Sequence, residues 1–330
     1  MRTITLEEHF ASPGFLEGPG KELKERAAHF PERFTRLMEQ LTDIGAKRIA
    51  EMDQAGIDMQ ILSLTAPGVE QLEPADAVVL ARESNDFLAE AIAKNPTRFG
   101  AFAALPTSSP DRAAEELQRR ATNHAFQGAV VNGHTRGRYL DDPFFSPILE
   151  CANSLSVPIY LHPTPPPEPV CQAWFSGFAP FVSEMLAGAG WGWHIETALH
   201  VIRMILGGVF DRFPNLQIIV GHMGETLPFM LQRLDVMPTA MTKLQRPMSS
   251  YLRGNVHYTF SGFNFTPTFL DLFLQVGVER IMFSADHPYA SMAQARAFLD
   301  QLPVSTANKH QIAHGNAERL LQLSFAAAEP

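Results

Sequence analysis

The chain has 330 residues, 45% of them hydrophobic, and a formal net charge of −9, so it can bury a large core as two domains or as one barrel. The acidic balance, with no Lys/Arg-rich block to neutralise phosphates, argues against a nucleic-acid partner. Two cysteines are too few for a disulfide framework. No stretch approaches the roughly 20 apolar residues of a membrane span, and the first residues lack the apolar region of a signal peptide. We therefore expect a cytoplasmic protein without a membrane partner.

Eight short segments have the apolar character of β-strands. In chain order they occupy residues 3–10, 59–65, 99–106, 128–134, 158–163, 217–224, 256–262 and 280–288. Several are almost continuously apolar rather than alternating, which is typical of parallel strands that are covered on both faces.

Helical patterns separate these strand segments. Apolar positions recur every three or four residues over 75–96, where Pro96 marks the end. Ser109 and Pro110 begin another helix, as a cap followed by proline in the first turn. Strands and helices that alternate eight times predict a (β/α)8 TIM barrel of the α/β class. A doubly wound sheet is the alternative, but no glycine-rich turn follows the first strand.

Two connections are longer than usual for a barrel. Residues 11–58 separate the first two strands and contain helix-like stretches at 21–30 and 33–56. Residues 164–192 follow the fifth strand and are rich in proline, glycine and aromatic residues. Connections of this length are usually functional loops or disordered, and the aromatic content disfavours disorder. We therefore predict one barrel domain over residues 1–330, with insertions at about 11–58 and 164–192, the second forming an ordered apolar wall.

Metal-binding residue types gather at the ends of the predicted strands, where barrel enzymes place their chemistry. Glu7 and His9 are two residues apart on the first strand and should face one side, while Glu8 faces the other. His162 ends the fifth strand and Asp286 ends the eighth. Two imidazoles and two carboxylates, without a thiolate, suit Zn²⁺, Mn²⁺ or Fe²⁺ and make a purely structural zinc site a weaker interpretation.

Each of these residues also has an ordinary structural interpretation. A lone histidine in an apolar strand, such as His162, is more often a satisfied core or surface group than a ligand. Glu7 could be a solvated strand end, and Asp286 could cap the following helix. The coincidence of such residues at the ends of separate strands favours a metal site.

The end of the sixth strand carries a further acid–base pair. His222 could be a fifth ligand or an acid–base group. Glu225, three residues later, could raise the pKa of His222 or simply favour the first turn of the next helix. Arg233 could bind a substrate carboxylate or form a structural ion pair. His194 is ambiguous beside the aromatic segment, and we expect His200 to pack in the core.

Together these motifs resemble the amidohydrolase superfamily, and within it the branch of metal-dependent decarboxylases that includes aminocarboxymuconate semialdehyde decarboxylase. The chain is similar in particular to the decarboxylases of γ-resorcylate (2,6-dihydroxybenzoate), 2,3-dihydroxybenzoate and 5-carboxyvanillate. The resemblance covers essentially the whole chain. It rests on LEEHF at 6–10, residues 132–163, residues 200–235, FSADHPY at 283–289 and IAHGNAERLL at 312–321.

The resemblance implies one divalent metal ion, Mn²⁺ or Zn²⁺, held by Glu7, His9, His162 and Asp286. Glu7 replaces the first histidine of the His-x-His pair of most amidohydrolases, as in the aromatic-acid decarboxylases. It also implies that His222, supported by Glu225, is the site histidine and that Arg233 lies near the substrate. His287 stands where several relatives carry an aromatic residue, which affects the shape of the pocket.

The implied activity is that of a carbon–carbon lyase: non-oxidative decarboxylation of an ortho-hydroxy aromatic acid that chelates the metal, with carboxylation as the reverse reaction. Asp286 is the first candidate to protonate the ring carbon, and His222 is the second. His9, Trp191 and Phe175 are expected to contact the substrate, the two rings as part of the apolar wall.

Two alternatives stay open. The aromatic residues of the second insertion could instead form a subunit interface, and relatives suggest a homodimer or homotetramer. The scaffold also permits a metal-dependent hydrolase of a lactone, ester or amide.

Overall fold

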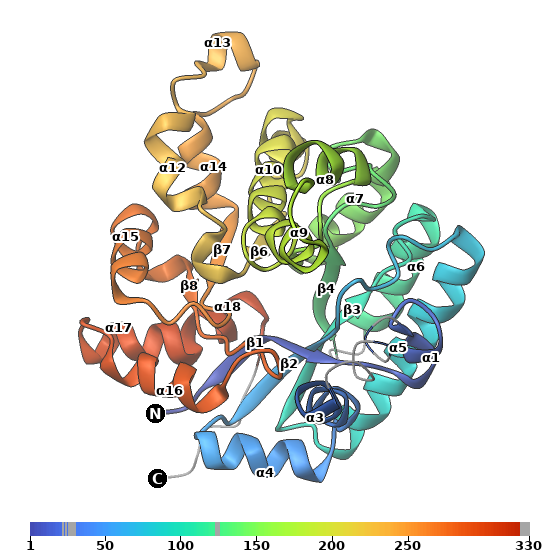
Figure 1. Cartoon of the computed structure of the whole chain (residues 1–330). Coiled ribbons are helices and arrows are strands. Elements are labelled where there is room, and N and C mark those ends of the chain that lie inside the picture. Colours follow the sequence, from blue (N-terminus) through green and yellow to red (C-terminus); the bar gives the residue numbers. More distant parts are fainter. Residues whose placement is uncertain (22, 24, 26–30, 123–125, 324–330) are drawn as a thin grey trace.

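Eight parallel strands form a barrel at the centre of the chain in a computed structural model (Figure 1). The structure describes residues 1–323 apart from 22, 24, 26–30 and 123–125. The strands are β1 (Ile4–Phe10), β2 (Met59–Leu64), β3 (Phe99–Ala104), β4 (Phe126–Asn132), β5 (Ile159–His162), β6 (Ile218–Val220), β7 (Val256–Thr259) and β8 (Ile281–Met282). Each pairs in parallel with the next, and every one falls within or overlaps a predicted segment. The (β/α)8 prediction is confirmed.

The barrel closes through a thin seam between β8 and β1. β8 has two residues, and one isolated parallel bridge joins Leu6 to Ser284. The backbone N–H of Leu6 donates to the carbonyl of Phe283 at 3.2 Å, and that of His9 donates to the carbonyl of His287 at 2.7 Å. Pairing with β1 thus continues past β8 as far as Ser284, two residues before Asp286.

Helices surround the barrel. They are α1 (Pro13–Glu17), α3 (Pro31–Thr42), α4 (Ala46–Ala55), α5 (Pro74–Lys94), α6 (Pro110–Ala121), α7 (Ser146–Leu155), α8 (Glu168–Phe175), α9 (Pro180–Ala187), α10 (Gly192–Leu206), α11 (Val209–Arg212), α12 (Leu227–Leu234), α13 (Thr239–Thr242), α14 (Met248–Gly254), α15 (Thr266–Val276), α16 (Met292–Gln301), α17 (Thr306–His310) and α18 (Asn316–Leu320). Among the helices that the structure describes, none has the length and apolar character needed to cross a membrane.

Two apolar layers hold the barrel together. One fills its interior, and the other lies between the strands and the surrounding helices. The inner layer includes Leu6, Ile61, Phe102, Tyr160 and Ile219, which come from different strands. Inward side chains from successive strands pack in this way in TIM barrels, and this leaves the carboxyl ends of the strands for polar residues.

The first insertion contains α1, α3 and α4. The predicted helical stretch 33–56 forms two helices, because the chain turns between α3 and α4, where Asp43 Oδ1 accepts a hydrogen bond from the N–H of Gly45 at 2.8 Å. Most of the predicted stretch 21–30 lies outside the described residues.

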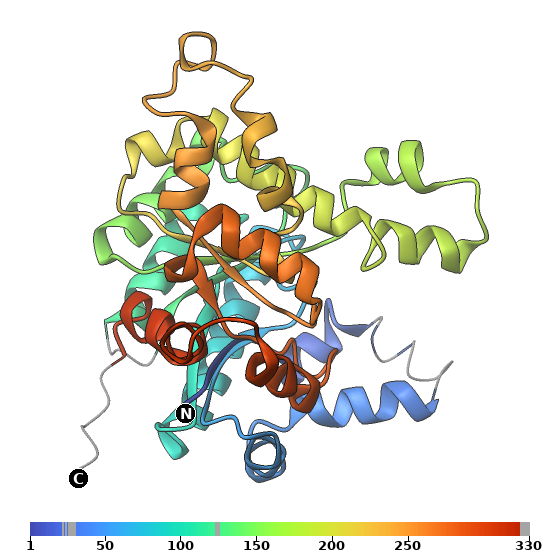
Figure 2. The same cartoon turned by 90° about the vertical axis from the view of Figure 1, so that its left-hand side faces the viewer.

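The second insertion forms an arm, defined here as residues 164–191. Its two helices, α8 and α9, project away from the barrel as the yellow-green segment of Figure 2. The insertion is ordered, as predicted, and it forms helices. The sequence predicts an apolar wall here, yet two of the rings of the arm, Trp174 and Phe178, are 62% and 58% exposed in the single chain. The arm therefore presents rings to solvent rather than covering the barrel with them.

Candidate active site

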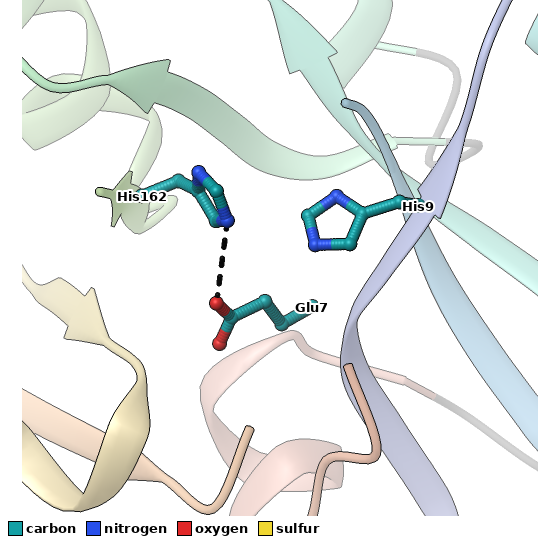
Figure 3. Close-up of side chains that lie close together, drawn as sticks. All are labelled: Glu7, His9 and His162. Carbon is teal, nitrogen blue, oxygen red and sulfur yellow. Dashed lines mark ion pairs between the residues drawn. The ribbon is translucent and has the colours of Figure 1, made fainter. Parts of the chain in front are cut away.

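The carboxyl end of β1 brings two metal-binding residue types into the barrel mouth. Glu7 and His9 point into one cluster with His162 from the end of β5 (Figure 3). The pairing register of β1 shifts between Thr5 and Glu8, and Glu7 has a left-handed backbone with φ 66°. Such a conformation is uncommon for a residue other than glycine and is often found at functional sites.

The ligand atoms of these three residues converge. One ligand atom from each of Glu7, His9 and His162 lies within 4.8 Å of the other two. Glu7 Oε1 is 3.5 Å from His162 Nε2, the contact drawn in Figure 3. The fourth predicted ligand, Asp286, is not a member of that tight group, but its Oδ1 lies 3.3 Å from His9 Nε2. The structure thus brings all four predicted residues to one place.

Several polar atoms of this cluster have no hydrogen-bond partner. Glu7 Oε1 and both ring nitrogens of His9 are buried without one among the described residues, and the 3.3 Å approach of Asp286 does not have the geometry of a hydrogen bond. Buried polar atoms are normally paired, so a set of unpaired ones needs an explanation. Carboxylate oxygens and imidazole nitrogens are ligands of Mn²⁺ and Zn²⁺. A divalent cation fits these residues.

The other oxygen of Glu7 is fixed by hydroxyl groups. Tyr160 and Ser261 donate hydrogen bonds to Oε2, and Thr259 Oγ1 lies 3.4 Å from it. Gly221 completes this surrounding, because a Cβ atom there would lie 2.3 Å from Oε2. These contacts orient the carboxylate so that Oε1 faces the cluster. Burial raises the pKa of Glu7 to about 8, and a bound cation would favour its ionised form.

A second buried cluster lies beside the first. Glu225 accepts hydrogen bonds from two histidines, from His222 Nδ1 to Oε1 at 2.7 Å and from His194 Nδ1 to Oε2 at 2.5 Å. His222 Nε2 faces Glu7 Oε1 at 3.8 Å and so connects the two clusters. The predicted pairing of His222 with Glu225 is present, and His194 from α10 joins it.

This second cluster holds a proton firmly. Burial would lower the pKa of His222, but the carboxylates of Glu225 and Glu7 outweigh it and raise the pKa to about 10. Burial would raise the pKa of Glu225, but His222 and His194 outweigh it and the pKa is lowered. His222 and Glu225 are therefore an ion pair near neutral pH, and Nε2 of the charged imidazole faces Glu7.

Three of the predicted substrate contacts are not tested by the structure of the single chain. Arg233 is exposed on α12, and no hydrogen bond or ion pair joins it to the four predicted ligands within the described residues. Trp191 is half exposed just before α10, and Phe175 is buried in α8, where its ring contacts Trp174. Their substrate contacts stay predictions. His287 Nε2 faces Glu51 at 3.7 Å rather than the metal cluster.

Some residues of the site were not identified from the sequence. Tyr160 precedes His162 by two residues on β5, and Ser261 follows Thr259 by two residues at the end of β7. That spacing places both members of a pair on one face of a strand, which could have pointed to them. Tyr289 packs its ring 5.3 Å from that of His9, a contact with no comparable signal.

Comparisons with known proteins identify the family of the chain. A family model described as Amidohydrolase matches residues 27–323. γ-Resorcylate decarboxylases from Polaromonas sp. and Rhizobium sp. are 37% and 38% identical to the chain; the matches cover 97% and 98% of this chain and 98% and 99% of the relatives.

Solved structures give the same result over the full length. A 2,6-dihydroxybenzoate decarboxylase in complex with 2,6-dihydroxybenzoate has a TM-score of 0.87 at 37% identity, covering 98% of this chain and 100% of that chain. A dihydroxybenzoic acid decarboxylase from Polaromonas sp., with bound manganese and the inhibitor 2-nitroresorcinol, has a TM-score of 0.89 at 36% identity, covering 98% of each chain. Sequence, fold and buried site agree, and the chain belongs to the amidohydrolase family.

Proposed function

We propose that this chain is a metal-dependent, non-oxidative decarboxylase of an ortho-hydroxy aromatic acid of the dihydroxybenzoate type. The observation that carries the proposal is the convergence of buried, unpartnered ligand atoms from Glu7 and His9 with His162 and Asp286 at the barrel mouth. The names of the relatives, which are γ-resorcylate and dihydroxybenzoate decarboxylases, supply the reaction class.

The proposed cofactor is one divalent ion, held by Glu7, His9, His162 and Asp286. Two carboxylates among the ligands favour Mn²⁺, and Zn²⁺ is the second choice. When bound, the ion supplies a Lewis acid that orients the phenolate and carboxylate of the substrate and offsets their charge.

Proton transfer is assigned to the residues beside that site. Asp286 in its protonated form donates to the ring carbon that bears the carboxylate. The bond between that carbon and the carboxylate then breaks, its electron pair restores the aromatic ring, and CO₂ leaves. Asp286 regains a proton from solvent. The same steps in reverse carboxylate the phenol.

His222 is the alternative donor, and otherwise holds the phenolic oxygen of the substrate. Its Nδ1 is bound to Glu225, so Nε2 is the nitrogen that can face a ligand. A protonated imidazole that is stabilised by a buried carboxylate can donate a hydrogen bond without losing its proton. Glu225 therefore acts by holding His222 in one orientation and charge state.

The arm and Arg233 are proposed to act in assembly and substrate binding. Exposed rings on the arm, among them Trp174, Phe178 and Phe181, form an apolar surface of the kind that subunit interfaces cover. We propose a homodimer or homotetramer on this basis. Arg233, Trp191 and Phe175, with His9, are the proposed substrate contacts.

A direct assay tests the function. Enzyme loaded with Mn²⁺ is incubated with 2,6-, 2,3- and 2,4-dihydroxybenzoate, and CO₂ and the corresponding phenol are measured. We expect turnover of at least one acid. Inactivity on all three, combined with hydrolysis of a lactone, ester or amide, would replace the proposal by the hydrolase alternative.

A further inference from the structure

The residue between the two proposed ligands of β1 makes contacts of its own. Glu8 is fully buried and points away from the metal cluster, toward the loop that follows β8. Its Oε1 accepts a hydrogen bond from the N–H of Ala285 at 2.8 Å, and its Oε2 accepts one from the N–H of His287 at 3.3 Å. The N–H groups on both sides of Asp286 are therefore held by one carboxylate.

This arrangement occurs where the barrel has the least backbone pairing. The seam between β8 and β1 has a single isolated bridge, and Asp286 follows it with a left-handed φ of 61°. That conformation is uncommon for residues other than glycine, although aspartate adopts it more readily than most, and surrounding contacts help to fix it. Glu8 supplies two such contacts, and the N–H of His9 supplies a third by donating to the carbonyl of His287 at 2.7 Å.

Glu8 is itself held in place from two sides. Gln60 on β2 donates to its Oε2 at 3.2 Å. The buried guanidinium of Arg48 donates to the carbonyl of His9 at 2.7 Å and interacts electrostatically with Glu8. The carboxylate therefore belongs to a rigid set of groups that spans β2, β1 and the loop after β8.

We infer that Glu8 is a positioning residue that sets the place of Asp286 relative to Glu7 and His9. Glu7 and His9 face the cluster on one side of the strand, and Glu8 fixes the fourth ligand from the other side. One tripeptide thus contributes two ligands directly and a third through its hydrogen bonds. The inference rests on the proposed metal site.

The test compares Mn²⁺ binding by the full chain and its Glu8→Gln variant. Glutamine keeps one acceptor oxygen, but its NH₂ group faces one of the two backbone N–H groups, of Ala285 or His287, and cannot accept a hydrogen bond from it. We expect Mn²⁺ affinity, measured by calorimetry on folded protein, to fall about 10- to 100-fold, as is typical when groups that orient metal ligands are removed. The electron paramagnetic resonance spectrum of bound Mn²⁺ should also change, which a loss of stability alone would not cause.

Glu70→Gln is the matched control. Glu70 is also buried and accepts two backbone hydrogen bonds, from Val69 and Asn132, both at 2.7 Å. It has no hydrogen bond or ion pair with a proposed ligand among the described residues. We expect Glu70→Gln to lower the melting temperature but to leave Mn²⁺ affinity and the resonance spectrum unchanged.

Glu8→Asp guards against a variant that fails to fold, because it keeps the charge but cannot reach both N–H groups. Wild-type affinity in either folded Glu8 variant would overturn the inference, and so would an equal loss of affinity in Glu70→Gln. Such results would overturn only the role of Glu8, and not the proposed function, if the wild type binds one Mn²⁺ and His162→Ala binds none. If the wild type itself binds no Mn²⁺, the proposed function is overturned and the role of Glu8 with it.

Discussion

Two buried clusters of the same residue types lie side by side in the barrel mouth, and they differ in their hydrogen bonding. In the cluster of Glu7, His9 and His162, Glu7 Oε1 and both ring nitrogens of His9 have no hydrogen-bond partner among the described residues. In the neighbouring cluster, both oxygens of Glu225 are occupied by the Nδ1 atoms of His194 and His222. The two clusters have similar residue types and are both buried. They differ in whether their polar atoms have hydrogen-bond partners.

The comparison assigns different roles to the clusters. Atoms that converge without partners suit a cation, because a cation would satisfy all of them at once. A carboxylate between two imidazoles is already satisfied and is suited to hold a proton in a defined place. The following changes test that division, from the largest expected effect to the smallest.

Removal of a ligand should have the largest effect. His162→Ala takes away one imidazole of the unpartnered cluster, so the purified protein should lose its stoichiometric metal and its activity. Elemental analysis measures the metal. The control is His194→Ala, in the other cluster, which should keep its metal. If His162→Ala retained a full equivalent, His162 would not be a ligand.

Asp286→Asn should abolish turnover while the fold persists. The amide cannot supply an acidic proton and is a poorer ligand, and loss of a general acid alone typically costs 10²- to 10⁴-fold in rate. Steady-state decarboxylation and metal content are measured together. Retained activity would remove Asp286 from both proposed roles.

His222→Asn should separate the two clusters functionally. We expect the metal to remain bound. The rate should fall by about 10² or more, because the protonated imidazole beside the proposed ligands is lost. Glu225→Gln should give a smaller loss in the same direction, because His222 stays but loses its charged partner. A metal-free His222→Asn protein would show that His222 is a fifth ligand.

A buried histidine outside both clusters gives the smallest effect and serves as a reference. The pKa of His257 is lowered to about 3, by burial first and then by Arg280 and Arg319. Below a pH of about 6.5 the unfolded chain binds a proton that the folded chain does not, so stability is lost as the pH falls toward 3.

Between pH 7 and pH 5 this histidine should contribute roughly 2 kcal/mol to the loss of unfolding free energy. In His257→Gln the amide oxygen can accept from Arg280, as the ring nitrogen does at 3.0 Å, without titrating. Urea unfolding at the two pH values should therefore show a smaller difference for the variant. Equal differences would show that His257 does not carry this dependence.

Much of the site could be predicted because strand ends are local features of a sequence. Glu7, His9 and His162 follow short apolar segments, and parallel strands in a barrel bring such ends together. Asp286 was found in the same way, although β8 itself has only two residues.

The remaining parts depend on tertiary packing that the pattern does not encode. His194 reaches Glu225 from a helix beyond the arm, so its role appears only when α10 is placed against the barrel. The aromatic composition of the arm predicts that its rings pack, but it does not say against what, and in the single chain Trp174 and Phe178 are exposed. Arg233 lies on a helical face whose surroundings the sequence alone does not define.

Gly221 has a consequence for how mutational scans of this protein should be interpreted. It bears no functional group, yet even a methyl group at this position would collide with the carboxylate of Glu7. Alanine, the mildest replacement, should therefore score as severely as the loss of a catalytic group. Its intolerance would report on the space that the Glu7 carboxylate needs, and a ranking of positions by sensitivity would place a residue without a functional group among the chemically active ones.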